Sequence, residues 1–187
     1  VPPAQHIVDL ASGPGAIALM LLASGWAQRA TAVEFDPLHA ALAAENAARN
    51  GLQLKVIQGS VTEVQGPDPA ELVLINPPYF DPNSGALAPE TRRADARALT
   101  QATLTDFLSM ASRTVSPTGA VVFAFPAARY VETLEALRAC GLSAGYVRFV
   151  HPRLGGEAQV SFVAATTRPA SASFGPPLCV RGAGSEY

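Results

Sequence analysis

Several residue types are scarce in this chain, and each scarcity excludes a class of protein. The 187 residues contain two cysteines, Cys140 and Cys179, and three histidines that lie far apart. This number and spacing provide neither a disulfide framework nor the ligand pattern of a zinc site, so we expect no metal. No apolar run approaches the roughly 20 residues that cross a membrane, so we expect no membrane partner.

Charged residues are also few. They make up 15% of the chain while apolar residues make up 49%, a balance typical of a globular protein and not of a disordered one. The formal net charge is −2 and the isoelectric point is about 5.9. Lys55 is the only lysine, and the other 12 basic residues are arginines. A protein that binds nucleic acid unaided usually carries a basic patch, so the overall charge gives an RNA substrate no support.

The first informative pattern is a strand, a glycine-rich turn and a helix in succession. Residues 6–11 (HIVDLA) are typical of a buried strand, Ser12-Gly13-Pro14-Gly15 of a tight turn, and residues 16–26 of a helix. The next expected strand contains Glu34, which lies 19 positions after Gly15. A carboxylate at about this spacing binds ribose hydroxyls in the nucleotide-binding half of a doubly wound sheet. The pattern therefore predicts a cofactor that contains a nucleoside.

The second pattern is Asn76-Pro77-Pro78-Tyr79, which directly follows the apolar run 71–75. Each proline fixes its own φ and has no N–H, so the segment forms a rigid edge after a buried strand. The Asn76 side-chain oxygen and the Pro77 carbonyl can both accept hydrogen bonds from one planar NH2 group. Tyr79 can stack on the ring that carries this group. A strand that simply ends in a Pro-Pro turn is the structural alternative, and the preceding pattern weakens it.

The remaining sequence alternates between expected strands and helices. We expect strands near residues 6–11, 31–35, 54–58, 71–76, 120–125, 143–150 and 158–167, and helices near 16–25, 37–50, 101–115 and 127–140. The connection from Pro152 to Gly156 is too short for a crossover helix, so the last two strands must pair antiparallel. Residues 169–187 are rich in proline, glycine and serine, and we expect them to form an irregular tail after one folded domain at 1–168.

A nicotinamide-dependent dehydrogenase is an alternative, because residues 13–18 (GPGAIA) fit the G-x-G-x-x-A dinucleotide fingerprint. That interpretation leaves Asp9 before the turn, and the Asn-Pro-Pro-Tyr sequence, without a role. A methyltransferase accounts for the turn and for both of these features.

Together these residues resemble a class I S-adenosylmethionine-dependent methyltransferase with an Asn-Pro-Pro-Tyr motif, over roughly residues 6–168. Within that class the chain is most similar to the bacterial tRNA(Val) adenine-N6 methyltransferase family. The narrower likeness rests on residues 76–80, the arginine-bearing stretch 92–97, the run 149–152 and the strand 159–167. The resemblance implies an α/β, Rossmann-like fold: a seven-stranded, mostly parallel sheet that ends in an antiparallel hairpin, with helices on both faces.

The resemblance also implies S-adenosylmethionine as the cofactor and direct methyl transfer to the exocyclic amino group of adenine in tRNA or another structured RNA. It implies residence in the cytoplasm, where such substrates occur. The cofactor-binding residues that it implies are Asp9, Ala11, Gly13, Gly15, Glu34, Phe35, Ser60, Val61 and Asn76. The implied catalytic residues are Asn76, Pro77 and Tyr79, and the implied substrate-binding residues are Tyr79, Phe80, Arg92, Arg93 and Arg97.

The chain departs from the class at three positions. Ala11 stands where glycine is common, Pro14 stiffens the turn, and Ser60 stands where many relatives carry an acid that meets the adenine of the cofactor. A hydroxyl can still accept a hydrogen bond from that adenine, more weakly than a carboxylate does.

Two further functions stay open. A protein-glutamine methyltransferase uses the same motif on a side-chain amide, which is also a planar NH2 group. A non-catalytic binding module could keep the fold without the cofactor, and Ser60 is the residue that favours it. Since Val1 lies five residues before the first strand, we expect that the chain lacks an upstream segment that helps to cover the active site in the resembled family. Residues 81–100 are long for a structureless connection, so we expect them to form a substrate loop.

Overall fold

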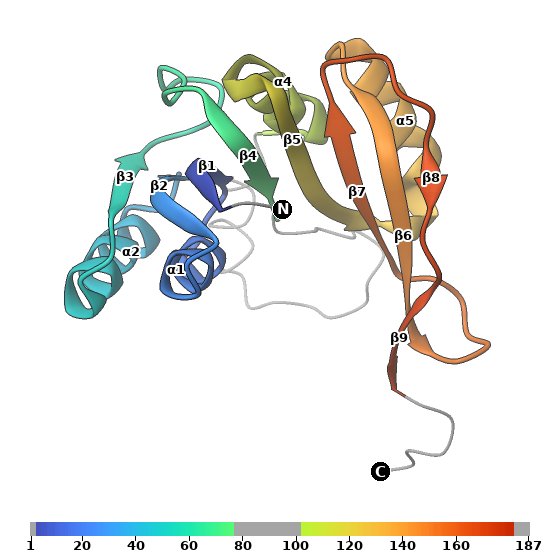
Figure 1. Ribbon diagram of the computed structural model, residues 1–187, viewed down its shortest axis with the longest axis horizontal. Helices are drawn as coiled ribbons and strands as arrows, with labels where there is room; N and C mark the ends of the chain where they lie inside the picture. Colours follow the sequence, from blue (N-terminus) through green and yellow to red (C-terminus); the bar gives the residue numbers. More distant parts are fainter. Residues whose placement is uncertain (1–2, 77–101, 182–187) are drawn as a thin grey trace, which may run out of the picture.

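The computed structural model describes residues 3–76 and 102–181, and the described part is built from strands and helices that mostly alternate (Figure 1). The first half contains β1 (Ala4–Leu10), α1 (Ala16–Ala23), β2 (Ala27–Glu34), α2 (Pro37–Asn50), β3 (Leu54–Gln58) and β4 (Ala70–Ile75). The second half contains α4 (Leu104–Thr114), β5 (Val115–Pro126), the short 3-10 helix η1 (Ala127–Arg129), α5 (Tyr130–Ala139), β6 (Ser143–Arg153), β7 (Val160–Thr166), β8 (Ser173–Phe174) and β9 (Leu178–Arg181).

All of these strands join one sheet, in the order β3-β2-β1-β4-β5-β7-β6-β8, with β9 also paired to β6. The five strands β3, β2, β1, β4 and β5 run parallel to one another. β7 runs antiparallel to both β5 and β6, between which it lies. The mostly parallel sheet and the antiparallel hairpin are therefore confirmed.

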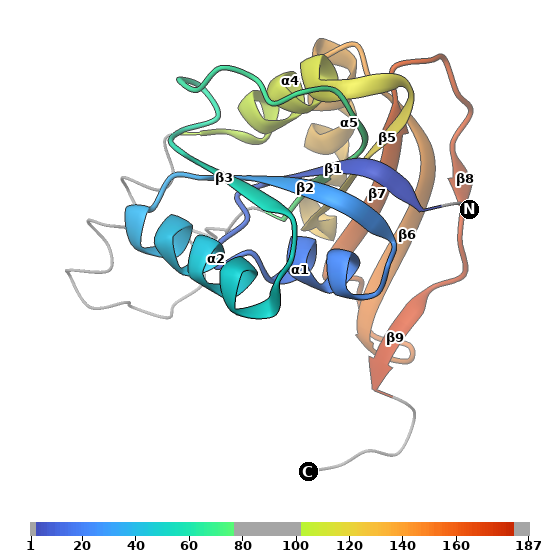
Figure 2. The same ribbon diagram turned by 60° about the vertical axis from the view of Figure 1, so that its left-hand side comes forward.

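Helices cover both faces of the sheet, as predicted. Figure 2 shows α1 and α2 on one face and α4 and α5 on the other. The pleat of each strand sends alternate side chains to opposite faces. In β1, Ile7 packs with Ala18 and Leu22 of α1, whereas Val8 and Leu10 join the larger core cluster beneath α4 and α5.

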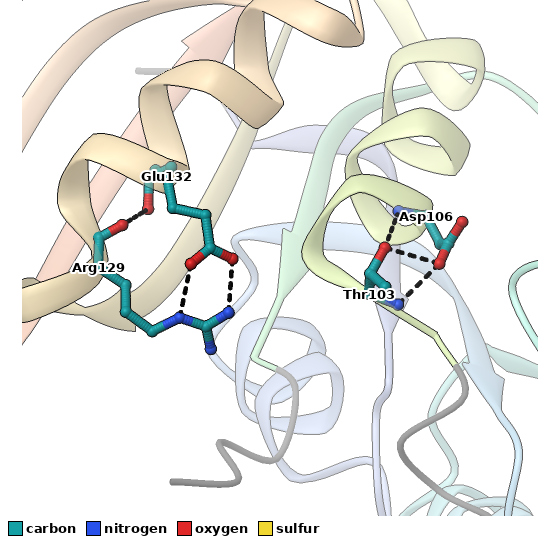
Figure 3. A network of polar contacts seen from close by, with 5 residues as sticks. Thr103, Asp106, Arg129 and Glu132 are labelled. Atoms are coloured by element: carbon teal, nitrogen blue, oxygen red, sulfur yellow. Dashed lines mark hydrogen bonds and ion pairs between the residues drawn. The ribbon is translucent and has the colours of Figure 1, made fainter. Parts of the chain in front are cut away.

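The ends of α2 and α4 carry the signals that set their bounds. The Asp36 side chain accepts hydrogen bonds from two backbone N–H groups at the start of α2, Pro37 fills the first helical position, and Gly51 ends the helix with φ 62°. At the start of α4, Thr103 and Asp106 form a capping box (Figure 3). Asp106 accepts a hydrogen bond from the Thr103 N–H at 2.7 Å, and the Thr103 hydroxyl accepts one from the Asp106 N–H at 3.3 Å.

The join between β5 and α5 depends on Arg129. Its guanidinium donates two hydrogen bonds to the carboxylate of Glu132 (Figure 3) and lies over the ring of Phe125, 4.7 Å from the ring centre. The first residue of α5, Tyr130, meets Phe149 of β6 edge to face, with 5.3 Å between ring centres. Arg129 thus ties the start of α5 to β5, and the ring contact packs α5 against β6 of the C-terminal hairpin.

The prediction of an irregular tail over 169–187 is wrong for part of that segment, because the tail carries two short strands. β8 is in register with Tyr146 and Val147, and β9 with residues from Val150 to Arg153. The sheet therefore has nine strands among the described residues, where seven were expected. The outer edge of β6 offers unpaired backbone groups, and a segment can pair with these without the alternating side-chain pattern that sequence analysis detects.

Candidate functional site

The carboxyl ends of β1, β2 and β4 lie side by side in the middle of the sheet. Leu10 of β1 is in register with Val33 of β2 on one side and with Ile75 of β4 on the other. Because the three strands are parallel, the residues that follow these positions gather at one edge of the sheet. This edge carries the glycine-rich turn, Glu34 and Asn76, so the structure brings together three features that sequence analysis singled out.

The turn after β1 has a backbone that favours glycine at several positions. Gly13 has φ 55° and Gly15 has φ 82°. A Cβ atom on Gly15 would lie 3.2 Å from the Cβ of Ala43 and 3.3 Å from a methyl group of Leu54, so α1 could not approach α2 and β3 as closely. Ala11 also has a positive φ, of 58°, the only such value at a non-glycine residue among those that the structure describes.

Asp9 is buried at the end of β1, and one of its carboxyl oxygens, Oδ2, has no hydrogen-bond partner among the described residues. Burial raises the pKa of Asp9 from its ordinary value of 3.8 to about 7. A hydrogen bond from the backbone of Ala18 opposes this rise, and the charge of Glu34 adds to it. A buried acceptor of this kind, next to a glycine-rich turn, is suited to a cationic or hydrogen-bonding group of a ligand.

Glu34 is buried as well, but both of its carboxylate oxygens are bonded. Oε2 accepts a hydrogen bond from the Gly13 N–H at 2.7 Å, and Oε1 accepts one from the Asp36 N–H at 2.9 Å. A carboxylate has about four acceptor positions, so each oxygen keeps the capacity to accept one more bond. Glu34 can therefore hold the two turns in place and still accept hydrogen bonds from the hydroxyls of a ribose.

Three further predicted cofactor residues lie near this edge. Phe35, directly after Glu34, has an exposed ring. Val61 is buried in the core. The Ser60 hydroxyl lies 2.8 Å from the hydroxyl of Thr62, and the Ser60 carbonyl accepts hydrogen bonds from two N–H groups of the following turn. Ser60 thus caps its own turn, which gives it a structural role besides the predicted one.

Sequence analysis missed one residue that shapes the site. The side-chain amide of Asn46, on α2, donates a hydrogen bond to the carbonyl of Pro14 at 3.1 Å. It anchors the glycine-rich turn from the second helix. The two residues are 32 positions apart and no motif joins them, so the sequence carries no signal for this contact.

Asn76 is the last described residue before the gap, and its side chain is exposed at the end of β4. The predicted residues Pro77, Tyr79, Phe80, Arg92, Arg93 and Arg97 lie outside the described residues. Their roles stay predictions.

The described residues contain neither a metal-binding cluster nor a membrane-spanning helix. No group of three or more histidine, cysteine, aspartate or glutamate residues is placed to hold a metal ion in the part of the chain that the structure describes. No helix within 3–76 or 102–181 has both the length and the apolar character that a membrane span requires.

The relatives of the chain among curated proteins include tRNA-modifying and protein-modifying methyltransferases. The chain is 36% identical over 138 residues to a tRNA1(Val) (adenine(37)-N6)-methyltransferase from Aeromonas hydrophila, a match that covers 70% of this chain and 56% of the relative. It is 35% identical over 98 residues to a release factor glutamine methyltransferase from Geobacter sulfurreducens, which covers 52% of this chain and 34% of the relative. The chain thus spans a little over half the length of the first relative.

A solved structure and a family pattern also match this chain, and both are of methyltransferases. A predicted O-methyltransferase from Agrobacterium tumefaciens has a similar solved structure, with a TM-score of 0.73 and 21% identity, over 97% of this chain and 83% of that one. At this identity the likeness shows a common fold. The sequence pattern of the methyltransferase small domain family matches residues 1–123, which is more than half of the chain. The chain therefore belongs to the methyltransferase small domain family.

Proposed function

We propose that this chain is the catalytic part of an S-adenosylmethionine-dependent methyltransferase that modifies the exocyclic amino group of adenine in RNA, and that the RNA is a tRNA. The observation that carries the proposal is the shared sheet edge at which Asp9, the glycine-rich turn, Glu34 and Asn76 meet. The first three suit a nucleoside cofactor with a charged tail. Asn76 opens a motif that suits a planar NH2 acceptor.

The residues at this edge fit the proposed cofactor. The partnerless Oδ2 of Asp9 suits the cationic amino-acid half, because a nearby positive charge favours the ionised carboxyl. Glu34 has acceptor positions left for two ribose hydroxyls, and the exposed Phe35 ring offers an apolar surface beside them. When bound, S-adenosylmethionine supplies an electrophilic methyl group on a sulfonium.

The acceptor side of the reaction falls to Asn76 and its neighbours. The lone pair of the adenine amino nitrogen is delocalised into the ring and is a poor nucleophile. In the proposal, the adenine amino group donates one hydrogen bond to the Asn76 side-chain oxygen and one to the Pro77 carbonyl, which favours a pyramidal nitrogen with a localised lone pair. Tyr79 stacks on the base. Alignment and fixed dipoles of this kind supply much of the rate enhancement.

We prefer RNA over protein as the acceptor because the tRNA-modifying relative matches a larger part of this chain. The match to the tRNA-modifying relative covers 70% of this chain, and the match to the glutamine-modifying relative covers 52%. Arg92, Arg93 and Arg97 supply the cations that a tRNA requires. The glutamine methyltransferase remains the second candidate, since its acceptor is also a planar amide. Residence in the cytoplasm stays an expectation.

One experiment separates the two candidates. The full-length protein is incubated with radiolabelled S-adenosylmethionine and separate pools of tRNA, rRNA, DNA and protein, and the labelled product is digested and identified. We expect label on N6 of adenine in tRNA. An Asn76→Ala variant, treated in parallel, should leave every pool unlabelled. Label on protein glutamine with none on tRNA would overturn the substrate and would leave the family unchanged.

A further inference from the structure

One face of the C-terminal part of the sheet is not covered by any helix of the described chain. α4 and α5 pack on the opposite face of β5, β7 and β6, where Phe123, Val163 and Val147 are buried (Figure 2). The residues that alternate with these point to the side on which α1 lies. Among them, Phe162 of β7 is 41% exposed, although it is a large apolar residue in a strand with two neighbours.

The register of the strands places Phe162 in one row with Asn76. Ile75 of β4 is level with Phe123 of β5, so Asn76 is level with Ala124. Ala124 is paired with Phe162, and Phe162 is paired with Arg148 of β6. The row runs Asn76, Ala124, Phe162, Arg148 across four adjacent strands. At the usual spacing between strands, Phe162 is roughly 10 Å from the end of β4, and Arg148 one strand further.

Phe162 and Arg148, the two members of this row that lie furthest from Asn76, have complementary chemistry. The exposed Phe162 ring offers a flat surface, and the small buried Ala124 separates it from the end of β4. The Nε–H of Arg148 donates a hydrogen bond to the carbonyl of Pro176 at 3.0 Å, which orients the guanidinium. No carboxylate within the described ranges forms an ion pair with Arg148. Directly paired residues of two antiparallel strands have Cβ atoms about 5 Å apart, so the Phe162 ring and the Arg148 guanidinium are close enough to contact the same ligand.

We infer that Phe162 and Arg148 bind the RNA strand next to the target adenine. This inference rests on the proposed function. The Phe162 ring stacks on a base that neighbours the target, and the Arg148 guanidinium contacts a phosphate of the same strand. Every base has a flat π-face, so such a platform accepts any sequence. An aromatic ring beside a guanidinium suits a nucleic-acid strand, in which flat bases alternate with anionic phosphates, better than it suits a peptide.

The test uses two substitutions with matched controls in the full-length protein. Phe162→Ala is compared with Phe174→Ala, whose ring is 64% exposed but lies on β8 in register with the buried Val147. Arg148→Ala is compared with Arg138→Ala, an exposed arginine on α5, which covers the opposite face of the sheet. The probes are fluorescein-labelled bulk tRNA and a single-stranded oligoadenylate. Circular dichroism melts and calorimetry with S-adenosylhomocysteine check that fold and cofactor binding are kept.

We expect both test variants to bind RNA about tenfold more weakly, with a raised KM for tRNA and an unchanged kcat at saturating tRNA. Their salt dependence should differ. Arg148→Ala should flatten the plot of log affinity against log salt by about 0.7, the value for one phosphate contact on a single strand, and Phe162→Ala should keep the slope of the wild type. The controls should behave as the wild type.

The outcomes distinguish this inference from the proposed function. If the wild type methylates tRNA and both test variants bind RNA as tightly as it does, the inference is wrong and the proposed function stands. An equal loss in the test and control variants would also overturn it, because the effect would not belong to this row. If the wild type neither binds nor methylates RNA, both fall. If the test variants lower only the methylation of a protein, this face binds a peptide and the assignment to RNA is wrong.

Discussion

The carboxylate of Glu34 accepts a hydrogen bond from the backbone N–H of Gly13 at 2.7 Å, across 21 positions of sequence. Its other oxygen accepts the N–H of Asp36 at 2.9 Å. One side chain therefore holds the turn after β1 and the turn after β2 in a fixed relation. The residue proposed to bind the ribose also builds the site that receives it.

Replacing Glu34 should accordingly affect both stability and binding. Glu34→Ala leaves two backbone N–H groups without their acceptor, so we expect the free energy of unfolding to fall by about 1–3 kcal/mol. Affinity for S-adenosylhomocysteine should fall by a further ~2 kcal/mol, through the lost bonds to the ribose. Urea unfolding and calorimetry measure the two effects. Glu135→Ala, at an exposed acid on α5, is the control, and an unchanged affinity in Glu34→Ala would refute the ribose assignment.

Ala11 offers a test of backbone strain. With φ 58°, its Cβ is crowded in a way that a glycine avoids, so Ala11→Gly should stabilise the protein by about 1 kcal/mol. The expected gain appears as a raised urea midpoint with an unchanged m-value. Ala41→Gly, at an exposed position inside α2, should have the opposite sign and cost about 1 kcal/mol. Destabilisation by both substitutions would show that the turn after β1 is not strained.

The raised pKa of Asp9 predicts a dependence of stability on pH. The folded protein keeps a proton on Asp9 up to about pH 7, whereas the unfolded chain releases it near pH 4. Unfolding is therefore favoured as the pH rises between these values, and the free energy of unfolding falls by an amount on the order of 4 kcal/mol. Asp9→Asn should remove this pH dependence, because an asparagine side chain does not titrate.

Urea unfolding of the wild type and of Asp9→Asn between pH 4 and pH 8 measures the effect. The variant should become progressively more stable relative to the wild type as the pH rises to 7, and the difference should then level off. Parallel curves over the whole range would show that Asp9 ionises in the folded protein as it does in water.

Asn76 carries the prediction about chemistry. Asn76→Ala should reduce kcat by about a hundredfold or more, because it removes an acceptor aimed at the reacting amino group. Affinity for S-adenosylhomocysteine should change little. Asn50→Ala, at the exposed end of α2, provides the control. Near wild-type turnover of Asn76→Ala with saturating substrate would contradict the proposed mechanism. Tyr79→Ala should also lower turnover through lost stacking, and Tyr79→Phe should have a mild effect.

Local patterns explain which parts of the fold were predictable. β1 and β4 contain short apolar runs that are followed by turn residues, and α2 carries Asp36, Pro37 and Gly51 at its ends, so the positions of these elements follow from adjacent residues. The antiparallel hairpin followed from the length of one connection. β8 and β9 escaped prediction because they are held by backbone pairing with β6, to which their own side chains give no clue.

The candidate site was also predictable only in part. Sequence spacing pointed to Asp9, the glycine-rich turn, Glu34 and Asn76, and the strand order brings these residues to one edge. The sequence could not show the hydrogen bond from Asn46 to Pro14, nor the row that joins Asn76 to Phe162 and Arg148. Those relations depend on the register between strands and helices that lie far apart in the chain, which a single sequence does not encode locally.

The tail strands β8 and β9 also reduce the tendency of the sheet edge to pair with other molecules. Without β8 and β9, the long strand β6 would end the sheet with a continuous row of unpaired N–H and C=O groups. Such a row is a template on which a strand from another molecule can assemble. Because β8 and β9 pair with β6 and are themselves short, the sheet edge exposes far fewer unpaired backbone groups. A chain cut at residue 168 would retain every residue of the proposed site, yet we expect it to aggregate at concentrations at which the 187-residue chain stays dispersed.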